Sequence, residues 1–263
     1  MNELRQKAKQ LLGEGAIDIF IAYEEGTKLP RPILAESEKD TENLVFDEKC
    51  TGNLAVYLTR KDLVKGKKVA ITASYYALKS IVQLFNENQL KEDSIRIFVL
   101  EEDNNSLKEL DTKESVLQFL QSATPPPKQS EEEIVKQIDS MSVEERWQFW
   151  TNEMSKCFKC YACRAACPMC YCSRCIVEVN RPQWIQPWSS TLSNMEWQIN
   201  RVMHMAGRCS DCGSCGAACP LGIPIHILTH KMSELVKLNF GDQNDKGNVL
   251  STFKPEDKES FIL

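Results

Sequence analysis

Cysteine is the residue type that dominates the chemistry of this sequence. The chain of 263 residues has 12 cysteines, and eleven of them lie between Cys157 and Cys219. The opening residues, MNELRQKAKQLLGEG, lack the apolar core of a signal peptide, so we expect a cytoplasmic protein. Because the cytosol keeps thiols reduced, so dense a cluster of cysteines indicates soft-metal ligation rather than a disulfide framework.

Two runs of cysteines share the spacing Cys-x-x-Cys-x-x-Cys-x-x-x-Cys-Pro. In bacterial ferredoxins, three cysteines of such a run bind one 4Fe–4S cluster and the fourth binds the other cluster. Zinc also binds four thiolates, but its sites usually consist of two separated Cys-x-x-Cys pairs. The spacing therefore predicts two 4Fe–4S clusters, one bound by Cys157, Cys160, Cys163 and Cys219, and the other by Cys209, Cys212, Cys215 and Cys167.

Four cysteines remain outside this scheme: Cys170, Cys172 and Cys175 in CPMCYCSRC, and the distant Cys50. Together they would make a third site, holding a further 4Fe–4S cluster or a zinc ion. In the alternative interpretation the first three are spare thiols of a cysteine-rich loop, and Cys50 is a small buried residue of its own domain. The sequence leaves both interpretations open.

Charge and composition divide the chain into two parts. Residues 1–156 carry 21 Lys+Arg and 28 Asp+Glu, whereas residues 157–263 carry 11 and 9. The net charge of −5 argues against a nucleic-acid-binding surface, and no apolar run approaches the length of a transmembrane helix. The proline-rich SATPPPKQSE reads as a linker. We expect an α/β domain over 1–121, a linker over 122–130, a helical ferredoxin-like dicluster domain over 131–240 and a polar tail over 241–263.

Residues 68–100 give the clearest local structure. KVAITA and SIRIFVL are expected to be strands, and SYYALKSIVQLFNENQ between them a helix, which makes a βαβ unit and a parallel sheet. The turn TASYYAL has no glycine-rich phosphate loop, so dinucleotide binding there is disfavoured. We also expect a helix over 2–12, a strand over 17–23, and helices over 131–138, 142–155 and 194–206. The apolar side of the last helix should consist of Met195, Ile199, Val202 and Met203.

The cysteine-rich segments CFKCYACRAACPMCYCSRC and HMAGRCSDCGSCGAACPLGIPIHIL, with RPQW between them, resemble those of dicluster proteins of strict anaerobes. These proteins are related to the beta subunits of deazaflavin-reducing hydrogenases and formate dehydrogenases, and accompany heterodisulfide reductase-like complexes. VFDEKCTGNLAVYL and the 66–102 segment look like the α/β domain of that group, so the resemblance covers roughly residues 15–232. This chain has Thr72–Tyr76 where relatives tend to have a Lys-Gly-Cys-Asp turn, which argues against flavin or deazaflavin binding at that turn.

Two adjacent clusters without a recognisable substrate site predict an electron-transfer subunit. The resemblance implies that it relays electrons between a catalytic subunit (a hydrogenase, formate dehydrogenase or flavin subunit) and an acceptor subunit, within an anaerobic, cytoplasmic complex of the heterodisulfide reductase-like kind. No catalytic residue and no residue binding an organic cofactor is assigned, and whether the chain is itself an enzyme stays open. One alternative is a flavin-dependent oxidoreductase with a substrate site in the α/β domain. Another is a zinc-stabilised scaffold.

Overall fold

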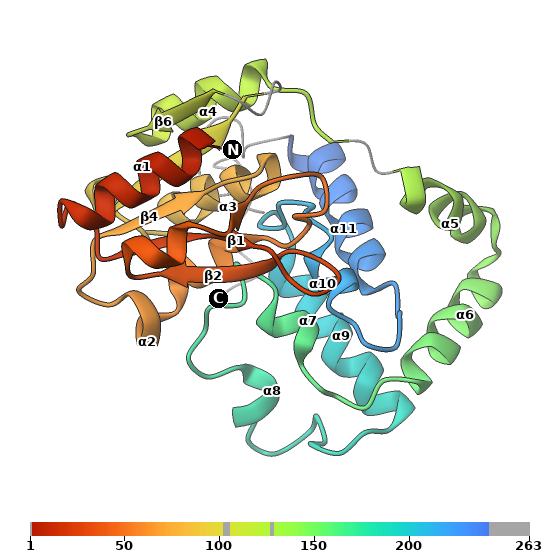
Figure 1. The fold of residues 1–263 in the computed structure, drawn as a ribbon. Helices are drawn as coiled ribbons and strands as arrows, with labels where there is room; N and C mark the ends of the chain where they lie inside the picture. The colour runs from red at the N-terminus through yellow and green to blue at the C-terminus, as the bar shows by residue number, and fades with distance from the viewer. Residues whose placement is uncertain (1, 102–105, 127–128, 242–263) are drawn as a thin grey trace, which may run out of the picture.

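The computed structural model describes residues 2–101, 106–126 and 129–241. The N-terminal half of these residues forms a mixed six-stranded sheet with helices packed on it (Figure 1). The strand order is β2-β1-β4-β5-β6, and β3 also pairs with β1. The strands are β1 Ile19–Glu24, β2 Arg31–Ala35, β3 Leu44–Val45, β4 Val69–Thr72, β5 Ile95–Leu100 and β6 Leu107–Leu110.

Only three strands of this sheet, β1, β4 and β5, run parallel to one another. Strands β2 and β3 pair antiparallel with β1, and β6 pairs antiparallel with β5. The connection over residues 25–30 between β1 and β2 is too short for the crossover that a parallel pair needs. The prediction of a parallel sheet was therefore wrong for its outer strands, whereas the α/β character is confirmed.

The predicted βαβ unit is present as β4, α3 (Tyr75–Asn86) and β5. Ser74 begins the helix, because its side chain accepts a hydrogen bond from the backbone N–H of Ala77. The two strands are in parallel register from Val69 opposite Ile95 to Thr72 opposite Phe98. This unit places the C-terminal end of α3 against the cysteine-rich half of the chain.

Alternating side chains of the central strands build a core on each face of the sheet. Phe20, Ala22 and Phe98 pack under α1 (Asn2–Gly13), the helix predicted over residues 2–12. Side chains of the opposite parity pack under α3, under α4 (Lys113–Ser122) and under the 3₁₀ helix η2 (Leu54–Thr59). Three short helices complete this half: η1 Glu38–Thr41, α2 Lys61–Val64 and η3 Glu92–Ser94.

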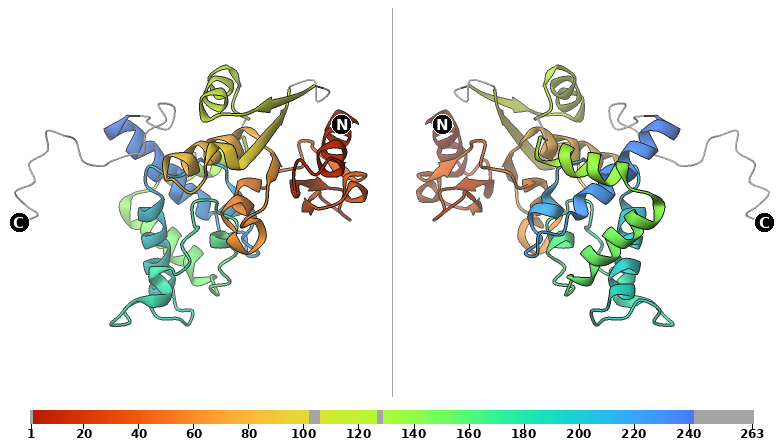
Figure 2. Two further views of the ribbon diagram at one scale, coloured as in Figure 1. Left: turned by 90° about the vertical axis from the view of Figure 1, so that its left-hand side faces the viewer. Right: turned by 90° about the vertical axis from the view of Figure 1, so that its right-hand side faces the viewer.

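The second half of the described chain is helical. Its helices are α5 Gln129–Ser140, α6 Val143–Ser155, α7 Ala162–Ala165, α8 Ile176–Val179, α9 Thr191–Met205, α10 Ser214–Ala217 and α11 Ile225–Phe240. Helix α9 packs against α6 and α11, and the two short helices α7 and α10 pack against each other. Figure 2 shows this helical half and α1 at opposite ends of the molecule. None of the described helices is long and apolar enough to cross a membrane.

The predicted linker corresponds to the segment between α4 and α5, of which residues 127–128 lie outside the described residues. Most of the predicted polar tail, residues 242–263, also lies outside them. Helix α6 starts as predicted: the Ser142 hydroxyl accepts from the Glu145 backbone N–H, and the Glu145 carboxylate accepts from the Ser142 N–H. The proposed domain boundaries themselves stay predictions.

The two halves of the described chain meet at the C-terminal end of α3. The Glu87 carboxylate accepts two hydrogen bonds from the Arg208 guanidinium, both at 2.6 Å, and a third from the Tyr171 hydroxyl at 2.6 Å. About two turns earlier, the hydroxyl of Ser80 donates to that of Ser210 at 2.7 Å in a buried position. This polar contact fixes the cysteine-rich loops against the α/β half.

Candidate metal centre

The two cysteine runs fold into loops with the same backbone conformation. The residue two positions after the first cysteine has a positive φ in both loops, 58° at Lys159 and 59° at Asp211. The residue four positions after the first cysteine also has a positive φ in both loops, 60° at Tyr161 and 71° at Gly213. Three of these four are not glycine, and such residues adopt the left-handed region only when the surroundings require it. The same strained conformation in both loops indicates that each loop forms a binding site of the same geometry.

The hydrogen bonds of the two loops also correspond. The backbone N–H of Lys159 donates to the Cys157 sulfur at 3.4 Å, and the backbone N–H of Asp211 donates to the Cys209 sulfur at 3.4 Å. Each loop then continues into a single helical turn, α7 or α10, followed by the fourth cysteine and proline. Backbone N–H groups directed at cysteine sulfur stabilise a thiolate or the sulfur of a bound cluster.

Because α7 and α10 pack together, the fourth cysteine of each run lies beside the other loop. Cys157 is within electrostatic range of Cys160, Cys163 and Cys219. The second group that the spacing predicted lines one cavity, which Arg201 and His230 also line: Cys167, Cys209, Cys212 and Cys215. The structure thus places Cys157 near Cys219 and Cys209 near Cys167, while the division of the thiols between two clusters stays a prediction.

Most of these thiols are held away from water. Burial raises the pKa of Cys163 to about 11, and it also raises the pKa of Cys157, Cys209 and Cys215. Cys160, in contrast, is exposed. The buried groups need a cation to become thiolates, and a metal ion or cluster supplies one.

Arg201 on α9 is the buried cation nearest to both groups. It is 6% exposed, and its Nη2 donates to the carbonyl oxygen of Cys163 at 3.2 Å. Its Nε and Nη1 are buried without a geometrically acceptable hydrogen-bond partner among the described residues. Sulfur atoms of four cysteines lie around it, and their charges raise its pKa although burial alone would lower it: Cys215, Cys167, Cys170 and Cys163. A buried guanidinium with free donors, surrounded by thiols, is suited to an anionic group such as an iron–sulfur cluster.

The buried side of α9 differs from the predicted one. Ile199 and Met203 are 51% and 58% exposed, so the prediction that they face the core was wrong. The helix instead buries Asn194 and Gln198 together with Arg201. The Asn194 amide donates to the carbonyl oxygens of Met154 and Cys157, at 2.9 and 2.7 Å, and the Gln198 amide donates to the Cys163 sulfur at 3.8 Å. Polar residues face inward because the cysteine loops offer acceptors there.

The remaining cysteines are divided between two places. Cys170, Cys172 and Cys175 line a cavity together with Arg201 and Arg208. Cys50 lies in the core of the α/β half, where its sulfur accepts from the Asp47 backbone N–H at 3.4 Å. Burial raises its pKa to about 11. No contact described for Cys50 joins it to the other three, so its part in a third site stays a prediction.

Tyr23 lies within electrostatic range of cysteines from both halves of the chain. Burial raises the pKa of the Tyr23 phenol, and the charges of Cys50 and Cys212 both add to this increase. Tyr23 donates a hydrogen bond to the carbonyl oxygen of Gly52 at 2.5 Å. Tyr23 therefore lies between the α/β core around Cys50 and the second cysteine run.

The described His, Cys, Asp and Glu side chains form no group of three that could hold one shared metal ion. A tetrahedral zinc ion would keep its thiolates about 4 Å apart, given a zinc–sulfur distance of about 2.3 Å. In a 4Fe–4S cluster each thiolate binds a different iron, so the sulfur atoms stand further apart.

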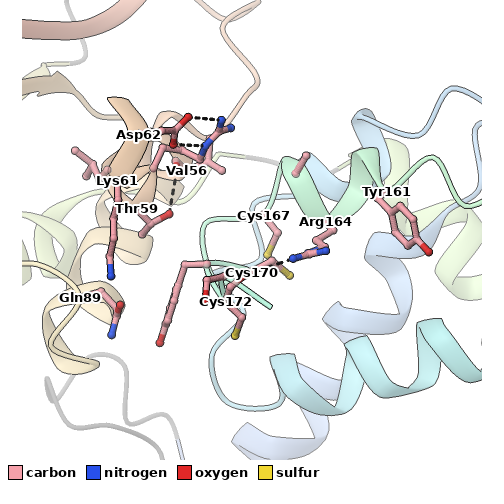
Figure 3. A pocket seen from close by; sticks show the side chains of 15 residues that line it. Val56, Thr59, Lys61, Asp62, Gln89, Tyr161, Arg164, Cys167, Cys170 and Cys172 are labelled. Carbon is pink, nitrogen blue, oxygen red and sulfur yellow. Dashed lines mark hydrogen bonds and ion pairs between the residues drawn. The ribbon is translucent and has the colours of Figure 1, made fainter. Parts of the chain in front are cut away.

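A cavity of about 680 Å³ separates the cysteine segment from the α/β half. In Figure 3, Arg164, Cys167, Cys170 and Cys172 lie on one side of it, and Lys61, Asp62 and Gln89 on the other. A cavity of this volume is within the range that binds small molecules and cofactors. It reaches the thiols from the side of η2 and α2.

Arg201, Asn194 and Gln198 were not identified from the sequence, and arginines adjacent to cysteines in the sequence are a poorer guide. In the structure Arg164 pairs with Glu178, and Arg208 with Glu87, so neither is a free cation for the thiols. The signal that would have found the others is their spacing. Residues 194, 198 and 201 recur at i, i+4 and i+7 and thus share one face of a helix.

Comparison with known proteins gives partial similarities, and no protein family model matches the chain. Over 112 residues, 41% of this chain, it is 30% identical to the F420-dependent formate dehydrogenase subunit beta of Methanocaldococcus jannaschii. Over 92 residues, 35% of the chain, it is 27% identical to the F420-dependent formate dehydrogenase 1 subunit beta of Methanococcus maripaludis. The matches span 29% and 23% of these relatives. Part of this chain is therefore similar to redox subunits of formate dehydrogenases, as the sequence motifs had indicated.

Proposed function

We propose that this chain is an iron–sulfur electron-transfer subunit of a larger oxidoreductase complex. One observation carries the proposal: two loops of the same strained conformation face each other, and the fourth cysteine of each run lies near the first cysteine of the other. The ligands of the first cluster would be Cys157, Cys160, Cys163 and Cys219. The ligands of the second would be Cys209, Cys212, Cys215 and Cys167.

A 4Fe–4S cluster, when bound, supplies reversible one-electron chemistry. The residues of this chain would determine where and how easily that chemistry occurs. The backbone N–H groups of Lys159 and Asp211 donate to ligand sulfur. Arg201 balances negative charge between the two groups, and Trp197, which is 2% exposed, helps to exclude water from the first.

The proposed partners follow from the similarity to formate dehydrogenase beta subunits, which are by name parts of a larger enzyme. The chain would relay electrons between a catalytic subunit (a formate dehydrogenase, hydrogenase or flavin subunit) and an acceptor subunit, in the cytoplasm of an anaerobe. An assembly of the heterodisulfide reductase-like kind belongs to the same proposal. It rests on the sequence motifs alone.

A second candidate is a flavin-dependent oxidoreductase. The 680 Å³ cavity favours it, because that space reaches Cys170 and Cys172 on one side and the positively charged Arg60 and Lys61 on the other. A flavin bound there would lie beside the cysteine segment. A yellow protein whose flavin absorbance is lost in Lys61→Ala would support this function over the first.

The test of the main proposal is iron and sulfide analysis of protein purified without oxygen, combined with electron paramagnetic resonance after reduction. We expect at least about eight irons per chain and two interacting signals. Cys212→Ser should remove or alter one signal, whereas Ser173→Ala, in the same half and exposed, should change neither. Wild-type protein with stoichiometric zinc and no iron would refute the proposal and favour a zinc-stabilised scaffold.

A further inference from the structure

The two cysteine loops share a backbone but carry opposite charges at one matching position. Lys159 and Asp211 each stand two residues after the first cysteine of their run, with φ of 58° and 59°. Both backbone N–H groups donate to the preceding cysteine sulfur at 3.4 Å. Because these hydrogen bonds are the same, they do not distinguish the two sites. The charges of the Lys159 and Asp211 side chains do distinguish them.

Lys159 provides a fixed positive charge at the first site. The residue is 7% exposed, and its Nζ donates to the carbonyl oxygens of Gln186 and Trp188 and to the hydroxyl of Ser193. An ammonium group has three hydrogens, and these three oxygen acceptors satisfy all of them. Burial lowers the pKa of Lys159, while the neighbouring Cys157 opposes that effect. The charge is thus held close to a proposed ligand of the first cluster.

Asp211 places a negative charge at the second site. Its side chain is 19% exposed, and its Oδ1 is buried without a hydrogen-bond partner among the described residues. The nearest described cation is Lys237, whose Nζ lies 3.8 Å from Oδ2 and whose side chain is 35% exposed, so water weakens this pair. Asp211 is two residues from Cys209, and its backbone N–H donates to the Cys209 sulfur at 3.4 Å. This carboxylate therefore acts on a proposed ligand of the second cluster.

The other buried cation acts on both sites. Arg201 lies near Cys163 of the first group and near Cys167 and Cys215 of the second, so it favours reduction at both sites and offsets part of the effect of Asp211 at the second. Exposure to water adds to the difference, because Cys160 of the first run is exposed while Cys212, at the matching position of the second run, is partly buried. Water stabilises the extra negative charge of a reduced site.

We propose that Lys159 and Asp211 set the two sites at different redox potentials, with the first site easier to reduce than the second. This inference rests on the proposed function. A reduced site gains one negative charge, which a neighbouring ammonium stabilises and a neighbouring carboxylate destabilises. Electrons would then pass from the second site, beside α3 and the α/β half, to the first site, where Cys160 and Phe158 reach the surface. An acceptor subunit would receive electrons at that exposed end.

The inference is tested by redox titration of the full chain, purified without oxygen and monitored by electron paramagnetic resonance. Cys160→Ser and Cys212→Ser identify which signal belongs to which site. Lys159→Met, which keeps the length of the side chain, is expected to lower the potential of the first site alone. Asp211→Asn is expected to raise that of the second alone. Each should change the equilibrium between the sites about tenfold, which is about 59 mV for one electron.

Lys156→Met is the matched control, because this lysine precedes Cys157 but is exposed and pairs with Glu153. Lys159→Arg keeps the charge and is expected to keep the potential of the first site if Lys159→Met does not fold. Equal potentials in the wild type, or a shift at the opposite site or in the opposite direction, would overturn the inference. Absence of iron in the wild type would instead refute the proposed function, so the two failures are distinct.

Discussion

Replacement of Glu87 by alanine tests what holds the two halves of the molecule together. The Glu87 side chain is only 8% exposed, and it accepts three hydrogen bonds of 2.6 Å, two from Arg208 and one from Tyr171. The Arg208 guanidinium also lies 5.4 Å from the centre of the Tyr171 ring. In Glu87→Ala, a guanidinium that is 24% exposed and a phenol lose their acceptor.

The magnitude follows from the burial of the pair. Removing one partner of a buried ion pair costs about 3–5 kcal/mol. Arg208 keeps the carbonyl oxygens of Met169 and His204 as acceptors and is partly reached by water, so the lower end of that range applies. Because 1 kcal/mol shifts the Tm of a domain of this size by roughly 2–4 °C, a loss of about 3 kcal/mol lowers it by roughly 6–12 °C.

The assay is thermal unfolding of the anaerobically purified protein by circular dichroism, with the iron content of each variant measured beforehand. Glu48→Ala, at an exposed glutamate of the same half, is the control and should unfold like the wild type. Limited proteolysis should cleave Glu87→Ala between the two halves sooner than Glu48→Ala. A Tm for Glu87→Ala within about 1 °C of the control would refute the reasoning, since it would show that this ion pair does not hold the halves together.

The pH dependence gives a second check on the same pair. Burial alone would raise the pKa of Glu87, but hydrogen bonds from Arg208, Gln83 and Tyr171 hold it below its usual value. A depressed pKa means that the stabilisation is present above the ordinary glutamate pKa, near 4.3, and is lost only as the pH falls through the lower, folded value. The difference in Tm between wild type and Glu87→Gln should therefore stay constant from pH 6 to pH 9. A steady decline across that interval would contradict this assignment.

Three further predictions concern the cysteine half. Asn194→Ala removes one hydrogen bond each from the carbonyl oxygens of Met154 and Cys157, which keep a second donor, so the cost is about 0.5–1.5 kcal/mol for each bond. This change should lower the iron content of the first site, whereas Asn200→Ala on the same helix should not; equal iron in both variants would contradict this. Burial raises the pKa of Cys163, Cys209 and Cys215, so iron uptake by the apo-protein must release protons. The amount of iron bound should therefore increase as the pH rises from 6.5 to 9, and pH-independent uptake would be contrary evidence. Since Cys50 packs in the α/β core, Cys50→Ser should leave the iron content unchanged, whereas a loss of about four irons would support its role in a third cluster.

The cysteine spacing predicted which thiols come together because the periodicity of a short loop is local information. The repeated spacing of the two runs was enough to predict a grouping of eight thiols. Cys50 could not be placed in that way, because its position depends on how the α/β half docks, and docking is made by Glu87 and Arg208, which are 121 residues apart. The mixed sheet has a similar cause. Strand direction at its outer strands depends on connection length, which the apolar runs alone do not indicate.

Helix α9 was predicted to face inward with its apolar side, and its actual orientation explains how the two sites are kept at a fixed separation. Its buried stripe begins at Asn194, bonded to the carbonyl oxygen of Cys157 in the first loop. The stripe continues through Arg201 between the two groups and ends at Met205, whose sulfur lies 3.7 Å from that of Cys167. Eleven residues of α-helix span about 16 Å, so one rigid element contacts both sites. An apolar side chain in this stripe would bury surface equally well, but it could neither bond to the loop carbonyls nor balance the charge between the sites. Two loops of the same backbone can therefore differ in charge, at Lys159 and Asp211, while one helix keeps the distance between them fixed.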